Sequence, residues 1–205
     1  MTNWDHPLFL VLLDGPRFHE SNWDAVASVM SFADALVVRY PGTHSRGLWE
    51  LALEVRHVAS EAALWVDGPL EVALALGAEG WHLPSTQIPA SLVRRHWTGR
   101  LSAAAHTPEE ASWHHGADLL VWGHAFRTRS KPNVCPRQNL ASVLLRSETP
   151  IVAIGGITRD TAPLLSGQGL RGVVVADGVW STPDPVQAAR QIRAAIDAPG
   201  WLHTK

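Results

Sequence analysis

The sequence predicts a (β/α)8 barrel, an α/β fold that uses the whole chain, residues 1–205, as a single domain. Short apolar runs alternate with longer amphipathic segments from one end of the chain to the other. Eight such strand–helix units follow one another at a spacing of roughly 22–28 residues, which is typical of parallel strands joined by right-handed crossovers. A doubly wound open sheet is the alternative. Its dinucleotide-binding form is disfavoured because no Gly-x-Gly-x-x-Gly motif follows the first apolar run.

The expected strands are apolar runs that end at a polar residue or a turn, as strands buried on both faces do. They cover Leu8–Leu13, Ala35–Arg39, Ala62–Val66, Gly80–Leu83, Leu101–Ala105, Asp118–Trp122, Ile151–Ile154 and Gly172–Ala176. The expected helices have apolar residues at helical spacing or a clear start signal, such as the cap, proline and acids from Thr107 to Glu110. They cover Asn22–Phe32, Ser45–Ala59, Leu70–Leu76, Pro89–Trp97, a segment from Thr107, Gln138–Ser147, a short segment from Thr158, and Asp184–Ala195.

Composition and charge exclude several classes of protein. Hydrophobic residues make up 46% of the chain and charged residues 18%, which fits a globular protein. The net charge of −2 and the lack of a Lys/Arg cluster argue against a nucleic-acid partner. Cys135 is the only cysteine, so there is no disulfide framework. The apolar run Leu8–Leu13 is too short for a signal peptide or a membrane span. We therefore expect a cytoplasmic protein without a membrane partner, and leave homo-oligomerisation open.

Polar residues follow the expected strands, and a barrel gathers such residues around one mouth. These residues are Asp14, Arg39, Asp67, His82, His106, His124, Thr128 to Lys131, Gly155-Gly156 and Asp177-Gly178. His124 lies one residue beyond the apolar run that ends at Gly123, so its imidazole would enter the mouth from a rigid strand end. Such a group can donate and accept protons near neutral pH. The alternative is a surface histidine on a flexible loop.

Three features of this mouth suit an anionic ligand. Gly155-Gly156 follows the seventh strand, where barrels often bind phosphate through backbone N–H groups; the alternative is a tight turn. Arg39 carries a permanent cation suited to a carboxylate or phosphate, and the alternative is an ion pair with Asp14 or Asp67. Lys131 either holds an anionic group or is solvated on its loop.

The remaining candidates have simpler structural explanations. His82 and His106 lie near strand ends, where a buried histidine bonded to the backbone is the more common outcome. His114-His115 falls at a helix end, where the helix dipole favours imidazolium. Cys135 is most simply an incidental loop thiol. Asp67 alone does not make a metal site, so no metal is expected.

Five passages, taken together, carry a family resemblance. They are Gly77–Pro84 (GAEGWHLP), Ala105–Ala111 (AHTPEEA), Gly116–Leu120 (GADLL), Gly123–Lys131 (GHAFRTRSK) and Pro150–Ile157 (PIVAIGGI). In this order the chain resembles the thiamin phosphate synthase superfamily over roughly residues 8–190. In that superfamily, synthases join a pyrimidine diphosphate to a thiazole phosphate with Mg²⁺. Thiazole tautomerases instead aromatise a thiazole carboxylate phosphate by moving a proton.

The resemblance is closer to the tautomerase branch, because His124 stands where the synthases usually carry proline. It implies a cofactor-free isomerase of thiamin biosynthesis whose small-molecule substrate is a thiazole carboxylate phosphate. His124 would be the catalytic acid and base. The other expected site residues would bind the substrate: Arg39, Thr128, Ser130 and Lys131, with Gly155, Gly156 and Gly178 for its phosphate. The resemblance implies neither a metal nor a cofactor.

Two alternatives stay open. A Mg²⁺-dependent thiamin phosphate synthase would hold its metal with two carboxylates; here Asp67 remains, Gln87 stands at the second position and Gly68 replaces an arginine. The other alternative is a catalytically silent barrel that binds a thiazole or thiamin-like ligand. Asp177 stands where the superfamily usually has a serine near the phosphate. A carboxylate about 4 Å from a phosphate charge would cost about 4 kcal/mol at an effective dielectric constant of about 20.

Overall fold

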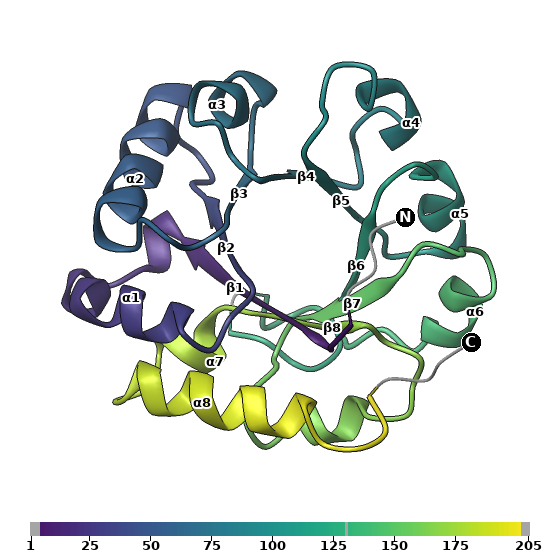
Figure 1. Ribbon diagram of the computed structural model, residues 1–205. Coiled ribbons are helices and arrows are strands. Elements are labelled where there is room, and N and C mark those ends of the chain that lie inside the picture. Colours follow the sequence, from purple (N-terminus) through teal and green to yellow (C-terminus); the bar gives the residue numbers. More distant parts are fainter. Residues whose placement is uncertain (1–4, 130, 202–205) are drawn as a thin grey trace.

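The structure, a computed structural model, describes residues 5–129 and 131–201. Within these residues, eight parallel strands close into a barrel and pair in the order in which they occur in the chain. The helices surround this barrel on its outer side (Figure 1). The prediction of a (β/α)8 barrel is confirmed, and the open-sheet alternative is wrong. None of the helices in the described ranges is long and apolar enough to span a membrane.

The strands follow the apolar runs closely. They are β1 (Leu8–Asp14), β2 (Ala35–Arg39), β3 (Leu64–Asp67), β4 (Gly80–Leu83), β5 (Arg100–Ala104), β6 (Leu119–Gly123), β7 (Ile151–Ile154) and β8 (Gly172–Val175). The bounds of β2, β4 and β7 are those predicted. The other strands differ from the prediction by one or two residues at one or both ends, where strand pairing frays.

The α-helices are of very different lengths. They are α1 (Trp23–Met30), α2 (Ser45–Val58), α3 (Leu70–Ala75), α4 (Ala90–Val93), α5 (Pro108–Trp113), α6 (Leu140–Leu144), α7 (Asp177–Trp180) and α8 (Pro185–Ile196). Three 3-10 turns accompany them in the described residues: η1 (Gly15–Arg17), η2 (Glu20–Asn22) and η3 (Ala162–Leu165). The predicted start of α5 is confirmed, because the Thr107 side chain accepts a hydrogen bond from the Glu110 N–H.

Several helix predictions need correction. The helix expected over Pro89–Trp97 ends at Val93, because the N–H groups of Arg95 and His96 bond to carbonyls three residues back and tighten the chain into turns. The helix expected from Thr158 does not form there. The Thr158 hydroxyl instead accepts hydrogen bonds from the N–H groups of Asp160 and Thr161, at 3.2 and 3.3 Å, and such local bonds compete with helix formation.

The helix expected over Gln138–Ser147 is also shorter and begins at Leu140. The preceding residue, Asn139, is bonded elsewhere. Its side chain accepts a hydrogen bond from Trp122 Nε1 at 3.1 Å and donates one to the His106 carbonyl at 2.9 Å. Asn139 therefore joins the ends of β5 and β6 just before the helix begins. The short helix α7 was not predicted.

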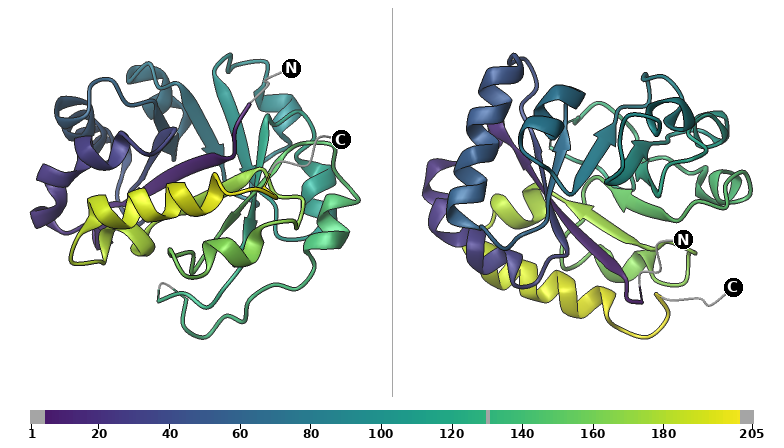
Figure 2. Two further views of the ribbon diagram at one scale, coloured as in Figure 1. Left: turned by 60° about the horizontal axis from the view of Figure 1, so that its bottom comes forward. Right: turned by 45° about the horizontal axis from the view of Figure 1, so that its top comes forward.

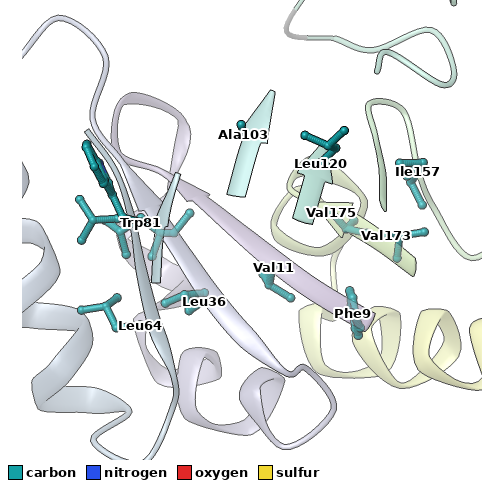
Figure 3. Close-up of a cluster of buried hydrophobic side chains, with 14 of the residues drawn as sticks. Phe9, Val11, Leu36, Leu64, Trp81, Ala103, Leu120, Ile157, Val173 and Val175 are labelled. Carbon is teal, nitrogen blue, oxygen red and sulfur yellow. The ribbon is translucent and has the colours of Figure 1, made fainter. Parts of the chain in front are cut away.

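Side chains alternate between the inside and the outside of the barrel along each strand, as the strand geometry requires. The inner cluster consists of Leu8, Leu10, Leu12, Ala35, Val37, Trp65, Leu119, Val121, Val152 and Val174. The outer cluster lies between the strands and the helices and includes Phe9, Val11, Leu36, Leu64, Trp81, Leu120, Val173 and Val175 (Figure 3). Continuing the alternation to the strand ends turns Asp14, Arg39, Asp67 and His82 inward.

The inner cluster is packed tightly around one large side chain. Trp65 is 4% exposed although it lies inside the barrel. A Cβ atom on Gly80, on the neighbouring strand, would lie 2.2 Å from the Trp65 ring. Because other inner side chains surround the ring, the ring has no room to move. Gly80 is therefore the residue that makes space for Trp65.

Gly80→Ala should lower the free energy of unfolding by about 1–3 kcal/mol, because the added methyl group overpacks the barrel interior. Urea unfolding monitored by circular dichroism measures this change. In a Trp65→Leu background the same substitution should cost much less, since the ring that it meets is gone. An equal cost in both backgrounds would show that this contact is not the cause.

Candidate active site

Two adjoining cavities open where the strands end. Cavity 1 has a volume of about 590 Å³ and lies among the loops that follow β6, β7 and β8. Cavity 2 has a volume of about 520 Å³ and lies among the loops that follow β2, β3 and β4. The two cavities share six lining residues: Leu12, Arg39, His124, Lys131, Ile154 and Val174. The mouth therefore has room for two ligand groups that meet at its centre.

The loop between β6 and α6 extends outward from the barrel (Figure 2) and begins with His124. Two backbone hydrogen bonds of 2.9 Å, from Ala125 to Ile154 and from Phe126 to Gly155, attach its start to β7. Arg137 closes its base. The Arg137 N–H donates to the His124 carbonyl at 2.9 Å, and Arg137 Nε donates to the Gly123 carbonyl at 2.7 Å. His124 is thus held by backbone contacts on both sides.

The His124 imidazole faces both cavities. Its Nδ1 and Nε2 atoms are buried and have no hydrogen-bond partner within the described residues. Burial is the largest cause that lowers the pKa of His124, followed by the nearby positive charge of Lys131. The ring is therefore neutral near pH 7 and offers one donor and one acceptor to a ligand.

The other two histidines at the mouth line cavity 2. His82 Nδ1 lies 2.8 Å from the Ser102 hydroxyl, so its partner is a side chain rather than the backbone that we expected. Burial lowers the pKa of His82 most, while the Asp67 carboxylate raises it. Burial also lowers the pKa of His106, and Arg137 adds to this effect. Both imidazoles are neutral at neutral pH.

Arg39 forms an ion pair with Asp14, which is one of the two ion pairs given above as the alternative to ligand binding. Its Nη2 and Nε atoms donate to Asp14 Oδ2 at 2.7 and 3.1 Å. Arg39 still lines both cavities. Arg17, in the turn after β1, has its Nη1 atom 3.8 Å from the same Asp14 oxygen. Its Nη2 atom donates to the Asp177 carboxylate.

Four charged side chains are thus linked along one side of the mouth, where β2, β1 and β8 are neighbours: Arg39, Asp14, Arg17 and Asp177. Arg17 was not identified from the sequence. Its only local signal is its place just after a strand end, and its partner Asp177 is 160 positions away in the chain.

The glycines after β7 and β8 line cavity 1. Gly155 and Gly156 have φ angles of +102° and +66°, which favour glycine. A Cβ atom on Gly156 would lie 2.2 Å from the Arg127 carbonyl, and one on Gly178 would lie 2.0 Å from the Ile157 carbonyl. Close packing therefore explains part of the glycine pattern. Within the described residues, however, the N–H groups of Gly155, Gly156 and Gly178 donate to no acceptor, so they remain able to bind an anion.

The loop after β6 contributes further cations. Thr128 and Lys131 line cavity 1, as the sequence led us to expect, and Lys131 also reaches cavity 2. Ser130 lies outside the described residues, so its substrate-binding role stays a prediction. Arg129, which the sequence placed at the mouth without a role, also lines cavity 1, and so do Arg127 and Arg159, which were missed. Exposed arginines in loops carry no pattern that distinguishes site residues from solvated ones.

The residues present do not fit the two-carboxylate Mg²⁺ site that the resemblance to synthases implies. Asp67 lines cavity 2. Gln87 is exposed, lies outside the linings of both cavities, and its carbonyl accepts a hydrogen bond from Trp113 Nε1 at 3.1 Å. No group of three or more His, Cys, Asp or Glu residues in the described ranges could hold a metal ion. We therefore assign no step to a metal.

The fold and the mouth together define a (β/α)8 barrel whose mouth is lined by several cations and glycines. The chain belongs to the thiamine monophosphate synthase family, whose model matches residues 11–179. A thiamine-phosphate synthase from Chloroflexus aurantiacus is 34% identical over 182 residues, covering 84% of each chain. One from Pyrococcus horikoshii is 28% identical over 202 residues, covering 95% of this chain and 98% of that one.

Solved structures agree with this assignment. A thiamine phosphate pyrophosphorylase from Pyrococcus furiosus superposes with a TM-score of 0.78 at 25% identity, covering 92% of this chain and 95% of that one. A 3-hexulose-6-phosphate synthase superposes with a TM-score of 0.68 at 17% identity, which indicates a shared fold only.

The expectation of a thiazole tautomerase, a cofactor-free isomerase, is wrong. The relatives that match most of this chain are named thiamine-phosphate synthase, and they are transferases by that name. The expectation gave too much weight to His124 at a single position. The similarity that extends over most of the barrel outweighs that one residue.

Four histidines with lowered pKa values predict a loss of stability in acid. His114 is fully buried, and burial lowers its pKa from the ordinary value of 6.5. The unfolded chain then binds more protons than the folded chain below about pH 6.5, so stability is complete above this pH and falls as the pH drops. The fall is at most about 1.4 kcal/mol per pH unit for each such histidine.

His114→Gln should make this fall shallower, as measured by urea unfolding at a series of pH values. His115→Gln, which changes the exposed neighbour, is the matched control and should leave the slope unchanged. Equal slopes for the wild type and both variants would exclude His114 as a source of the acid sensitivity.

Proposed function

We propose that this chain is a transferase of the thiamine-phosphate synthase type. It would join a pyrimidine that carries a methylene diphosphate to a thiazole phosphate, and release diphosphate. The observation that carries this proposal is the pair of adjoining cavities that share Arg39, His124 and Lys131. A reaction between two phosphorylated molecules needs two such spaces that meet where the new bond forms. The family to which the chain belongs supports the same reaction.

The reaction requires charge stabilisation more than proton transfer. The bond between the methylene carbon and the diphosphate oxygen breaks, and its electron pair leaves with the diphosphate. The thiazole nitrogen donates its lone pair to the same carbon and forms the new carbon–nitrogen bond. No proton is gained or lost in this exchange. Cations that face the departing diphosphate therefore stabilise the charge that develops on it.

Each cavity suits one substrate. Cavity 1 has the unbonded glycine N–H groups and an excess of cations, which suit the phosphate of the thiazole. Cavity 2 combines apolar side chains such as Tyr40 and Leu48 with the polar groups of His82 and His106, which suit an aromatic heterocycle. Arg39 and Lys131 lie between the two and would face the diphosphate. Thr128 would assist in cavity 1.

His124 then acts as a neutral hydrogen-bonding group between the two substrates. Its buried, unpartnered nitrogens can orient a ring nitrogen or a phosphate oxygen without adding charge. This role requires no titration during turnover, which agrees with a pKa lowered by burial and by Lys131.

The proposal is tested by incubating the purified protein with hydroxymethylpyrimidine diphosphate and hydroxyethylthiazole phosphate, with and without Mg²⁺. Thiamin phosphate and diphosphate should appear in equal amounts, as measured by chromatography and a diphosphate assay. Binding of both substrates without any product would contradict a synthase. That result would support the silent ligand-binding barrel, the alternative to which Gln87 and Asp177 point.

The size of the effect of His124→Ala distinguishes its possible roles. We expect kcat/KM to fall by roughly 3- to 10-fold, the value of one hydrogen bond between neutral groups. A fall of roughly 100- to 10,000-fold would instead indicate general acid–base catalysis and contradict the orienting role. Circular dichroism and urea unfolding of the variant serve as the control for folding.

A further inference from the structure

Cavity 1 contains a carboxylate that opposes its use as an anion site. Asp177 lines this cavity together with Gly155, Gly156 and Gly178, whose N–H groups would face a phosphate. A bare carboxylate among these groups would repel the phosphate at short range. Something in the chain must therefore offset the charge of Asp177 if the cavity is to bind an anion.

Arg17 is the side chain in position to do this. It lies in the turn after β1, the strand that pairs with β8, and also lines cavity 1. Its Nη2 atom donates to Asp177, and its Nη1 atom lies 3.8 Å from Asp14 Oδ2. Asp14 has a second and closer cation in Arg39, at 2.7 Å. The pairing with Asp177 is therefore the contact that depends on Arg17.

We propose that Arg17 is the residue that determines anion binding in cavity 1, both by neutralising Asp177 and by donating directly to the ligand's phosphate. This inference rests on the proposed function for the identity of the phosphate ester. A guanidinium group has five N–H donors in one plane. It can hold Asp177 with one edge and still direct further donors into the cavity.

The charges around the cavity agree with this role. Its lining includes the cations Arg17, Arg39, Arg127, Arg129, Lys131 and Arg159. It also includes the carboxylates Asp160, Asp177 and Asp184. Within the part of the chain that the structure describes, Arg17 is the cation that bonds to Asp177. Removing it would change the site twice, because one cation is lost and one carboxylate is released.

The test is a double-mutant cycle of Arg17→Gln, Asp177→Ser and the double variant. The probes are inorganic phosphate and hydroxyethylthiazole phosphate, and the measurement is the dissociation constant by isothermal titration calorimetry. Arg17→Gln should weaken binding of both probes by roughly 10- to 100-fold, the value of a charge-assisted hydrogen bond. Asp177→Ser alone should leave binding unchanged or make it tighter, because it removes a carboxylate and frees the Arg17 guanidinium for the ligand.

The double variant decides the matter. It should regain about tenfold or more of the affinity that Arg17→Gln loses, because no uncompensated carboxylate remains. Failure of Asp177→Ser to restore any affinity would overturn the proposal, as would unchanged binding by Arg17→Gln. Arg95→Gln, which removes an exposed cation outside both cavities, is the matched control and should bind like the wild type.

Two further measurements keep the outcomes distinct. Urea unfolding of each variant checks folding; if Arg17→Gln does not fold, Arg17→Lys replaces it in the cycle and should still bind more weakly than the wild type. Synthase turnover of the wild type is measured separately. If the wild type shows no turnover but the dissociation constants change as expected, only the proposed function is contradicted. Turnover by the wild type together with equal dissociation constants for all variants would contradict only the role of Arg17.

Discussion

The alternation of side chains along the barrel strands is the constraint on which the rest of this molecule depends. The same rule that turns Leu8, Leu10 and Leu12 into the barrel also turns Asp14 inward at the end of β1. Charged groups can lie inside a barrel only at its open end, where water or a ligand can reach them. The position of the polar mouth therefore follows from the same register that builds the apolar interior.

Charge at this mouth is balanced in pairs before any ligand arrives. Asp14 is 5% exposed and is held by Arg39 and Arg17, so no isolated carboxylate is buried there. Within the described residues, three cations that line cavity 1 form no ion pair and lie in the loop after β6: Arg127, Arg129 and Lys131. A site organised in this way could accept an anion without a large rearrangement of its buried groups, because exposed cations lie at its edge.

The sequence predicted the strands well because each is a short apolar run bounded by a turn. It placed Arg39, His124 and the glycines at the mouth because they end such runs or follow them closely, and Lys131 because it belongs to the loop that begins with His124. It missed α7, since four residues cannot show a helical period. It also missed Arg17, whose importance arises from a contact with Asp177 at the start of α7, which the closure of the barrel between β1 and β8 brings close. The choice of the tautomerase branch failed for a different reason, because one residue cannot outweigh the similarity of a whole barrel.

The contacts of Arg137 have a consequence for how this protein can change during evolution. These hydrogen bonds hold the two ends of the loop between β6 and α6 together, and His124 lies on the barrel side of them. The cost of closing a loop grows only slowly with its length. The part of the loop between His124 and Arg137 can therefore gain, lose or exchange residues while the His124 imidazole keeps its position. The ligand preference and the position of His124 can therefore change independently, although both belong to the same loop.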